Sequence, residues 1–186
     1  MHVTSICRLV TFDKIKIILK SFVESQFAYS PLVWMFHNRK VNSKINRVHE
    51  RALRLLYTDD VSTFDELLKR DGSFTIHQRN IQSVAIEMYK AKNNIGQQLL
   101  REIFVEREYN GPALRTVSDF VMPNINTVHF GEDSLRFYGN KIWNLIPPGI
   151  KYVDTIAAFK KLIKGWVPER CPCRLCRQFI SGVGFI

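Results

Sequence analysis

Hydrophobic residues recur with the period of an α-helix along most of the chain. The clearest case lies between Pro31 and Tyr57, where apolar residues follow one another at steps of four, three, four and three. These residues are Val41, Ile45, Val48, Ala52 and Leu55. Such spacing places them on one face of a helix. We therefore predict that this apolar stripe packs against a core.

A second stripe follows the same steps one position earlier and is entirely basic. We call it the basic stripe, and it consists of Lys40, Lys44, Arg47, Arg51 and Arg54. Because successive helical residues are about 100° apart, the two stripes lie roughly a quarter-turn apart. A charged stripe is ordinarily a solvated face. Five charges of one sign, with only Glu50 nearby to oppose them, favour contact with a polyanion about equally.

Capping signals predict further helices before and after this segment. Thr11 can cap a helix that begins at Phe12, and Thr63 with Glu66 forms a capping box that starts a short helix. Thr75, Ser134 and Thr155 hold the same position before later segments of helical period. The helix after Thr75 is expected to bury Ile81, Val84, Ala85 and Met88. In the helix that begins at Phe12, the apolar face expected to lie in the core consists of Phe12, Ile15, Leu19, Phe22 and Val23. The fold class predicted is mainly α, a small helical bundle.

The pattern changes between Val105 and Gly131, where Gly-Pro and Pro-Asn pairs interrupt the chain. Residues 114–117 and 125–130 have the composition of short strands, so we predict a minor β-hairpin here. On these patterns the chain divides into residues 1–10 without a pattern, a helical segment over 11–57, a helical domain with the hairpin over 58–168, and a Cys-containing tail over 169–186.

Composition narrows the class of protein. The 186 residues are 46% hydrophobic and 12% aromatic, which is typical of a globular chain. Lys and Arg number 27 against 17 acids, and the net charge of +10 favours nucleic acid as a partner over an anionic membrane surface. No apolar run reaches the length of a membrane span, and the first ten residues lack the apolar core of a signal peptide. We therefore expect an intracellular protein, in the nucleus or cytoplasm.

Three of the four cysteines stand together as Cys171, Cys173 and Cys176. In a reducing compartment such a cluster indicates a metal more than a disulfide, and structural zinc takes four ligands. The fourth ligand would be Cys7, His49, His77 or His129, and the sequence does not choose among them. The alternative is a tail that carries reduced cysteines.

Several motifs together resemble a known family. Tyr29, Pro31 and Trp34 precede the basic helix, which contains His-Glu-Arg-Ala-Leu-Arg at 49–54. Further motifs follow in order: Ile-His and Arg-Asn at 76–80, Glu-Met-Tyr-Lys at 87–90, Thr-Val-His-Phe-Gly at 127–131, Ser-Leu-Arg at 134–136, Ile-Trp-Asn at 142–144, and the closing Cys-Pro-Cys-Arg-Leu-Cys. From about Arg8 to Ile186 the chain resembles the region after the palm in reverse transcriptases of LINE-type non-LTR retrotransposons, the jockey-like group especially.

The resemblance implies roles in gripping template and primer and in contacting RNA of the element. It makes residues 11–57 thumb-like and the following segment a post-thumb domain. The fingers and palm of the RNA-directed DNA polymerase, with their catalytic aspartates, would lie upstream of Met1. We therefore expect a truncated, non-catalytic remnant that binds RNA or DNA. The alternatives are a protein-interaction module, whose basic helix docks on an acidic partner or on a separate palm domain, and a pseudogene fragment without a cellular role.

One motif spells the catalytic box of reverse transcriptases, Tyr57-Thr58-Asp59-Asp60. Phosphoryl transfer by two metal ions needs such aspartates in the turn of a β-hairpin, with a third carboxylate on a neighbouring strand. Here the box follows a helical segment and precedes the capping box at Thr63. We therefore predict a loop at a helix end and assign no catalytic residue.

The cysteine cluster generates the first testable prediction. If Cys171, Cys173 and Cys176 hold zinc, protein purified without added metal should carry about one equivalent, and a chelator should loosen the C-terminal tail. Elemental analysis and limited proteolysis measure the two effects. Anaerobically prepared protein that contains no zinc would contradict the prediction.

Overall fold

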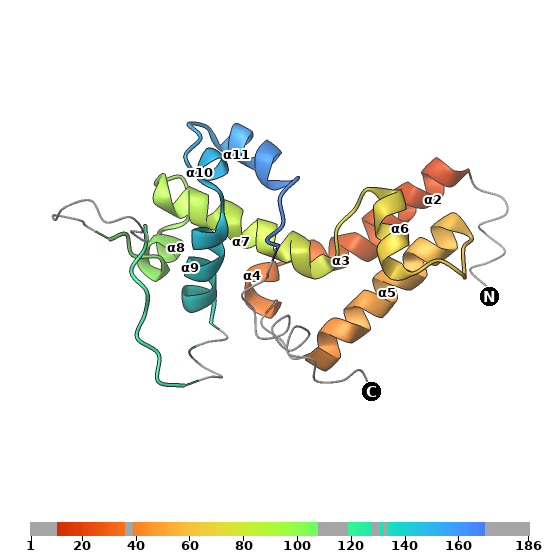
Figure 1. Ribbon diagram of the computed structural model, residues 1–186, viewed down its shortest axis with the longest axis horizontal. Helices are drawn as coiled ribbons and strands as arrows, with labels where there is room; N and C mark the ends of the chain where they lie inside the picture. Colours follow the sequence, from red (N-terminus) through yellow and green to blue (C-terminus); the bar gives the residue numbers. More distant parts are fainter. Residues whose placement is uncertain (1–10, 36–38, 108–118, 128–130, 132–133, 170–186) are drawn as a thin grey trace. The chain divides into compact units, whose positions relative to one another are not determined.

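The structure, a computed structural model, describes residues 11–35, 39–107, 119–127, 131 and 134–169 (Figure 1). It is mainly helical, as predicted. The chain forms two compact units, Met1–Asn80 and Ile81–Ile186. The boundary between the units falls inside a helix, and the segment after Tyr57 joins the first unit because its helix packs on the basic helix.

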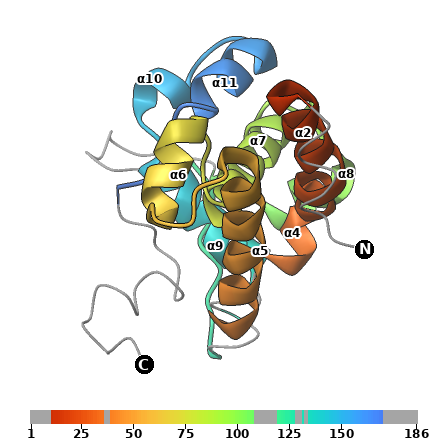
Figure 2. The same cartoon turned by 90° about the vertical axis from the view of Figure 1, so that its right-hand side faces the viewer.

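The first unit is built around the helix that carries the basic stripe. Its elements are α2 (Phe12–Leu19), the π-helical turn η1 (Lys20–Glu24), α3 (Ser25–Ala28), α4 (Pro31–Trp34), α5 (Arg39–Tyr57), α6 (Phe64–Asp71) and the first turn of α7 (Ile76–Lys92). Both α2 and α6 pack against α5, and Figure 2 shows α5 between them. Leu53 of α5 forms a buried cluster with Leu67 and Leu68 of α6.

Local signals in the sequence explain where α6 begins and ends. Thr63 and Glu66 form the predicted capping box, in which the Glu66 carboxylate accepts the Thr63 N–H at 2.7 Å and the Thr63 hydroxyl accepts the Glu66 N–H at 3.4 Å. Gly72 ends the helix with a φ of 64°, a left-handed conformation that glycine adopts without a steric penalty. These two ends hold the buried leucines of α6 opposite α5.

The second unit has an aromatic core. Its elements are the remainder of α7, α8 (Gln98–Ile103), α9 (Leu135–Leu145), α10 (Pro148–Lys151) and α11 (Ile156–Ile163). The Trp143 ring of α9 lies between Phe120 and Phe159, with centroid distances of 5.7 and 6.2 Å. The predicted inward face of α7 is confirmed, since Ile81, Val84, Ala85 and Met88 are fully buried. The caps at Ser134 and Thr155 are also confirmed, because each hydroxyl accepts a backbone N–H of the following turn.

Several predictions differ from the structure. The Thr11 side chain makes no capping hydrogen bond, although the helix begins at Phe12 as expected. The predicted core face of α2 is only half-buried at Ile15, Leu19 and Val23, whereas Phe12 and Phe22 are exposed. The hairpin is not supported, because the described residues hold one antiparallel bridge, between Glu106 and Phe120, in place of paired strands. Residues 125–127 are not a strand, and 114–117 and 128–130 lie outside the described residues. Phe120 is fully buried, so aromatic packing holds this segment where strand pairing was expected.

Among the described residues, no helix combines the length and the apolar content that crossing a lipid bilayer requires.

Close packing in the second unit generates a prediction about Gly139 of α9. A Cβ atom at this position would lie 2.6 Å from Phe104 Cε1 and 3.1 Å from Met88 Sδ. Gly139→Ala should therefore destabilise the unit by about 1–2 kcal/mol, because overpacking outweighs the gain in helix propensity. Gly149→Ala, where no atom lies within 4 Å of the new Cβ, is the matched control. Thermal unfolding of both variants measures the difference, and equal midpoints would contradict the prediction.

Candidate functional site

The buried face of α5 is not the one that the apolar stripe predicts. His49, Ala52, Leu53 and Leu56 are buried against the unit. Of the predicted stripe only Ala52 is buried and Ile45 is half-buried. Val41, Val48 and Leu55 are exposed, Val48 by 44%. The packed face is turned toward His49 because α2 and α6 contact that side of α5.

This rotation leaves most of the basic stripe in solvent. Lys44, Arg47 and Arg51 are exposed. None of these three side chains forms an ion pair with any acidic residue in the part of the chain that the structure describes. They follow one another at steps of three and four residues, so they lie on one helix face within two turns. The side chain of Lys40 lies outside the described residues.

Arg54, the last member of the basic stripe, is occupied within the protein. Its guanidinium donates two hydrogen bonds to Glu50 Oε1, at 2.7 and 3.1 Å, and a longer one to the carbonyl of Asp59. Glu50 stands four residues before Arg54, which is the spacing that supports a helical ion pair. Arg54 therefore contributes little free charge to the stripe.

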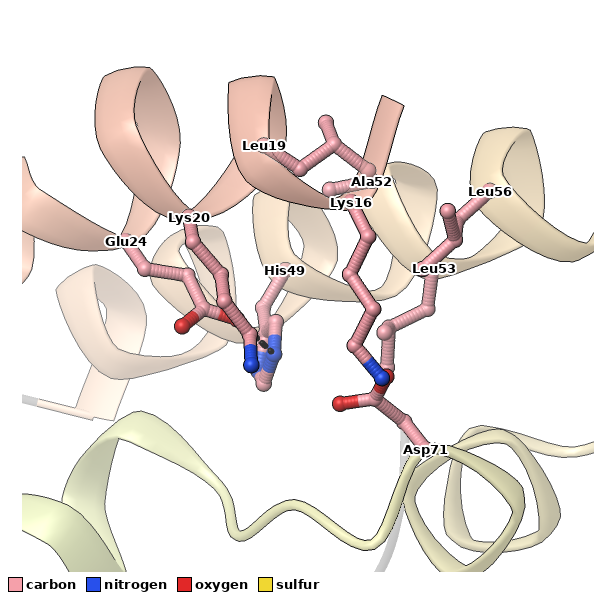
Figure 3. Close-up of a pocket in the computed structure, with 9 residues that line it drawn as sticks. All are labelled: Lys16, Leu19, Lys20, Glu24, His49, Ala52, Leu53, Leu56 and Asp71. Carbon is pink, nitrogen blue, oxygen red and sulfur yellow. Dashed lines mark ion pairs between the residues drawn. The ribbon is translucent and has the colours of Figure 1, made fainter. Parts of the chain in front are cut away.

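The opposite side of α5 faces a small pocket within the first unit (Figure 3). The pocket is lined by Lys16, Leu19, Lys20, Glu24, His49, Ala52, Leu53, Leu56 and Asp71. Lys16 donates to Asp71 at 2.7 Å, and the hydroxyl of Tyr57 donates to the same carboxylate at 3.0 Å. Although burial alone would raise it, the bond from Lys16 holds the pKa of Asp71 below its ordinary value. This contact fastens α2 to the end of α6.

His49 lies at the centre of a second polar contact of the pocket. Arg79 binds Glu24 through two nitrogens, at 2.7 and 3.2 Å, and its Nη2 lies 3.2 Å from His49 Nε2. Since arginine can only donate, Nε2 accepts and the proton of the neutral ring lies on Nδ1. Nδ1 is buried without a hydrogen-bond partner among the described residues. The contact of Arg79, Glu24 and His49 joins η1, α5 and α7, so this polar contact serves the packing of the first unit.

The Tyr-x-Asp-Asp box lies in a loop at the end of α5, as predicted. Thr58 has a φ of 51°, and α6 begins only at Phe64. The Asp59 carboxylate accepts hydrogen bonds from the N–H groups of Val61 and Ser62 and from the Ser62 hydroxyl, at 2.7–3.0 Å. These bonds lower the pKa of Asp59. Asp59 thus closes a turn between two helices.

The residues of the predicted zinc site are mostly not described. Cys171, Cys173, Cys176, Cys7 and His129 lie outside the described residues. His49 and His77 lie within them, and both are buried. The described residues contain no group of three or more His, Cys, Asp or Glu side chains that could hold a metal ion.

Comparison with models of known protein families, with curated proteins and with solved structures finds no match.

One cluster in the second unit has no counterpart in the sequence analysis. Asp119 accepts hydrogen bonds from Trp143 Nε1 at 2.6 Å and from the Tyr152 hydroxyl at 3.2 Å. Lys92 and Lys151 approach the same carboxylate. These five residues come from four separate segments of the chain, so no local sequence motif could have predicted that they lie together.

The burial of His49 generates a prediction about pH. Burial first, and the nearby charge of Arg79 second, lower its pKa to about 4 from 6.5, so the folded state keeps the ring neutral while the unfolded state takes up a proton. The stability that this provides is complete above pH 6.5 and is lost as the pH falls toward 4, by at most about 1.4 kcal/mol per pH unit.

Urea unfolding at pH 4.5, 5.5 and 6.5 measures this loss. In His49→Gln the free energy of unfolding should vary less with pH than in the natural protein, because position 49 no longer titrates. Nearby carboxylates remain in both proteins, so the difference between their slopes isolates His49. Equal slopes would show that the ring is protonated in the folded state.

Proposed function

We propose that the protein binds nucleic acid without catalysis and uses the basic stripe of α5 to follow a phosphate backbone. The observation that carries this proposal is the set of three exposed cations, Lys44, Arg47 and Arg51, which have no acidic partner among the described residues. A paired cation gains little from a phosphate because it must first give up its carboxylate. Unpaired cations replace condensed counterions directly.

Spacing along the helix supports a backbone contact. At a rise of 1.5 Å per residue, the three cations lie roughly 4.5 and 6 Å apart along the helix axis. They form a short linear array, which suits successive phosphates of one strand. Contacts of this kind position a protein on nucleic acid but do not read bases, so sequence specificity should be low.

The resemblance to the thumb region of LINE-type reverse transcriptases supports the same proposal. On that basis we propose that residues 11–57 are thumb-like and that the sequence corresponds to the region after the palm of an RNA-directed DNA polymerase. The cysteine cluster at 171–176 is proposed to hold a structural zinc ion. An intracellular location, in the nucleus or cytoplasm, follows from the same proposal.

Exposed apolar side chains favour a second candidate function, docking on another protein. On α2 and η1, Ile17 and Phe22 are exposed by 62% and 73%. Beside the basic stripe, Val48 and Leu55 are exposed as well. Exposed apolar side chains that form a contiguous patch commonly mark an interaction site. An acidic protein or a palm domain would suit a surface that combines apolar and basic side chains.

The basic stripe generates a prediction about salt dependence. Changing Lys44, Arg47 and Arg51 together to Gln should reduce the slope of log K against log salt by about two units on single-stranded RNA, because each lost phosphate contact removes about 0.7. The loss should be similar for unrelated RNA sequences. Fluorescence anisotropy at four or more salt concentrations measures the slope.

Two controls show whether a change in the slope comes from this site or from the loss of net charge alone. Changing Lys160 and Lys161 of α11 and the following Lys164 to Gln removes the same charge from exposed positions of the other unit and should reduce the slope less. Arg54→Gln should leave the slope nearly unchanged, since Arg54 is paired with Glu50. An unchanged slope in the folded α5 triple variant would exclude this helix. A natural chain that binds no RNA at low salt would exclude the proposal and favour protein docking.

A further inference from the structure

The cluster around Asp119 in the second unit holds two ammonium groups and one carboxylate. Lys92 Nζ lies 3.0 Å from Asp119 Oδ2, and Lys151 Nζ lies 3.9 Å from the same oxygen. Trp143 and Tyr152 donate hydrogen bonds to this carboxylate as well. One negative charge is thus shared between two positive charges, and the cluster keeps a net charge of plus one.

The chain holds these groups in place from several directions. The backbone of Asp119 is fixed because its carbonyl accepts the Arg107 N–H at 2.9 Å and the next residue, Phe120, is fully buried. Lys92 and Lys151 are the last residues of α7 and α10. Cations are favoured at helix C-termini. The two ammonium groups are therefore held in position before any ligand arrives.

The charge of Lys151 is incompletely satisfied. At 3.9 Å it is beyond hydrogen-bond distance from Asp119, and its ammonium has no hydrogen-bond acceptor among the described residues. Its side chain is only 11% exposed. Burial lowers the pKa of Lys151, the Asp119 charge opposes that shift, and the charge of Lys92 adds to it. An anion that reached this ammonium would find a partly desolvated cation with unused donors.

Tyr152 places an aromatic ring beside the two lysines. Tyr152 is 59% exposed, and the centroid of its ring lies 4.9 Å from Lys92 Nζ and 5.9 Å from Lys151 Nζ. Trp143, by contrast, is fully buried and serves the core. The two ammonium groups lie over the Tyr152 ring. An exposed ring with cations next to it combines the two contacts that proteins use for unpaired nucleotides, stacking for the base and charge for the phosphate.

We propose that Tyr152, Lys92 and Lys151 bind single-stranded nucleic acid, with one unpaired base stacked on the Tyr152 ring and an adjacent phosphate at the surplus ammonium of Lys151. This inference rests on the proposed nucleic-acid function and adds a preference for single strands. A cluster with only a structural role needs one cation to neutralise Asp119. That role leaves the exposed ring unexplained. It also leaves unexplained the unused hydrogen-bond donors of the second cation, which lies 5.4 Å from the centroid of the buried Trp143 ring.

The test compares ring and charge variants of the full chain on labelled single-stranded RNA and on a duplex of the same sequence. Tyr152→Leu should weaken single-strand binding roughly tenfold, within the range for one stacked base, and should change duplex binding little. Tyr152→Phe keeps the ring and should bind within about twofold of the natural protein. Lys151→Gln should weaken binding and reduce the salt slope on single strands by about 0.7.

Further controls show whether a loss of binding comes from this site, from a failure to fold or from the first unit. Phe22→Leu removes a similarly exposed ring from the first unit and should leave binding unchanged. Thermal unfolding should show Tyr152→Leu close to the natural protein, because the ring is largely outside the core. If Tyr152→Leu does not fold, Tyr152→Phe and Lys151→Gln together still test the proposal. In that case a Lys151→Gln variant that binds like the natural protein would overturn the proposal.

The outcomes distinguish this inference from the proposed function. If the natural chain binds RNA and only the α5 variants weaken it, the Tyr152 site is excluded while the basic stripe stands. Equal losses on single strands and duplex in Tyr152→Leu would exclude stacking. If the natural chain binds neither RNA form at low salt, the proposed function fails and this inference fails with it.

Discussion

The contact of Arg79 with Glu24 and His49 decides which face of α5 is buried. Its three groups come from α7, η1 and α5, and the histidine lies at the centre of the packed face. Measured around the helix, this face is centred roughly 70° from the centre of the apolar stripe, by the 100° step of an α-helix. The basic stripe consequently moves from about a quarter-turn to almost half a turn away from the core. A buried polar contact on one side of α5 thus sets the exposure of the cations on the other.

Local features of the fold could be predicted from the sequence, because they depend on few neighbouring residues. The capping box at Thr63, the caps at Ser134 and Thr155 and the inward face of α7 all follow from spacing and residue type. In α7 the apolar residues Ile81, Val84, Ala85 and Met88 follow one another at steps of three, one and three, and all of them are buried. Period and burial therefore agree there.

The errors arise where a tertiary contact overrides a local pattern. In α5 the apolar arc is wide enough for several orientations, and the choice depends on Arg79, which lies 30 residues from His49. Near Phe120 the pattern indicated a strand pair, but burial among Phe104 and Trp143 satisfies that residue without a sheet. The Asp119 cluster was missed for the same reason, since Lys92, Trp143 and Lys151 meet only after the helices pack. Of the predicted site, the shared helix face of Lys44, Arg47 and Arg51 follows from their spacing, whereas their exposure depends on which face of α5 is packed. The pairing of Arg54 depends on Glu50, four residues earlier.

Net charge alone does not predict where a binding surface lies, because many cations form ion pairs within the fold. Lys16, Arg54, Arg79 and Lys92 each hold a carboxylate, and each of these pairs joins or shapes a helix. The positive charge available to a partner is what remains after this pairing. In the first unit the remainder includes the array on α5, and in the second it includes an ammonium beside an exposed ring. An array of flexible exposed cations suits a repeating phosphate backbone, whereas a fixed, half-buried ammonium with a ring suits a single nucleotide. On the proposed function, the two arrangements would therefore contact different parts of a nucleic acid.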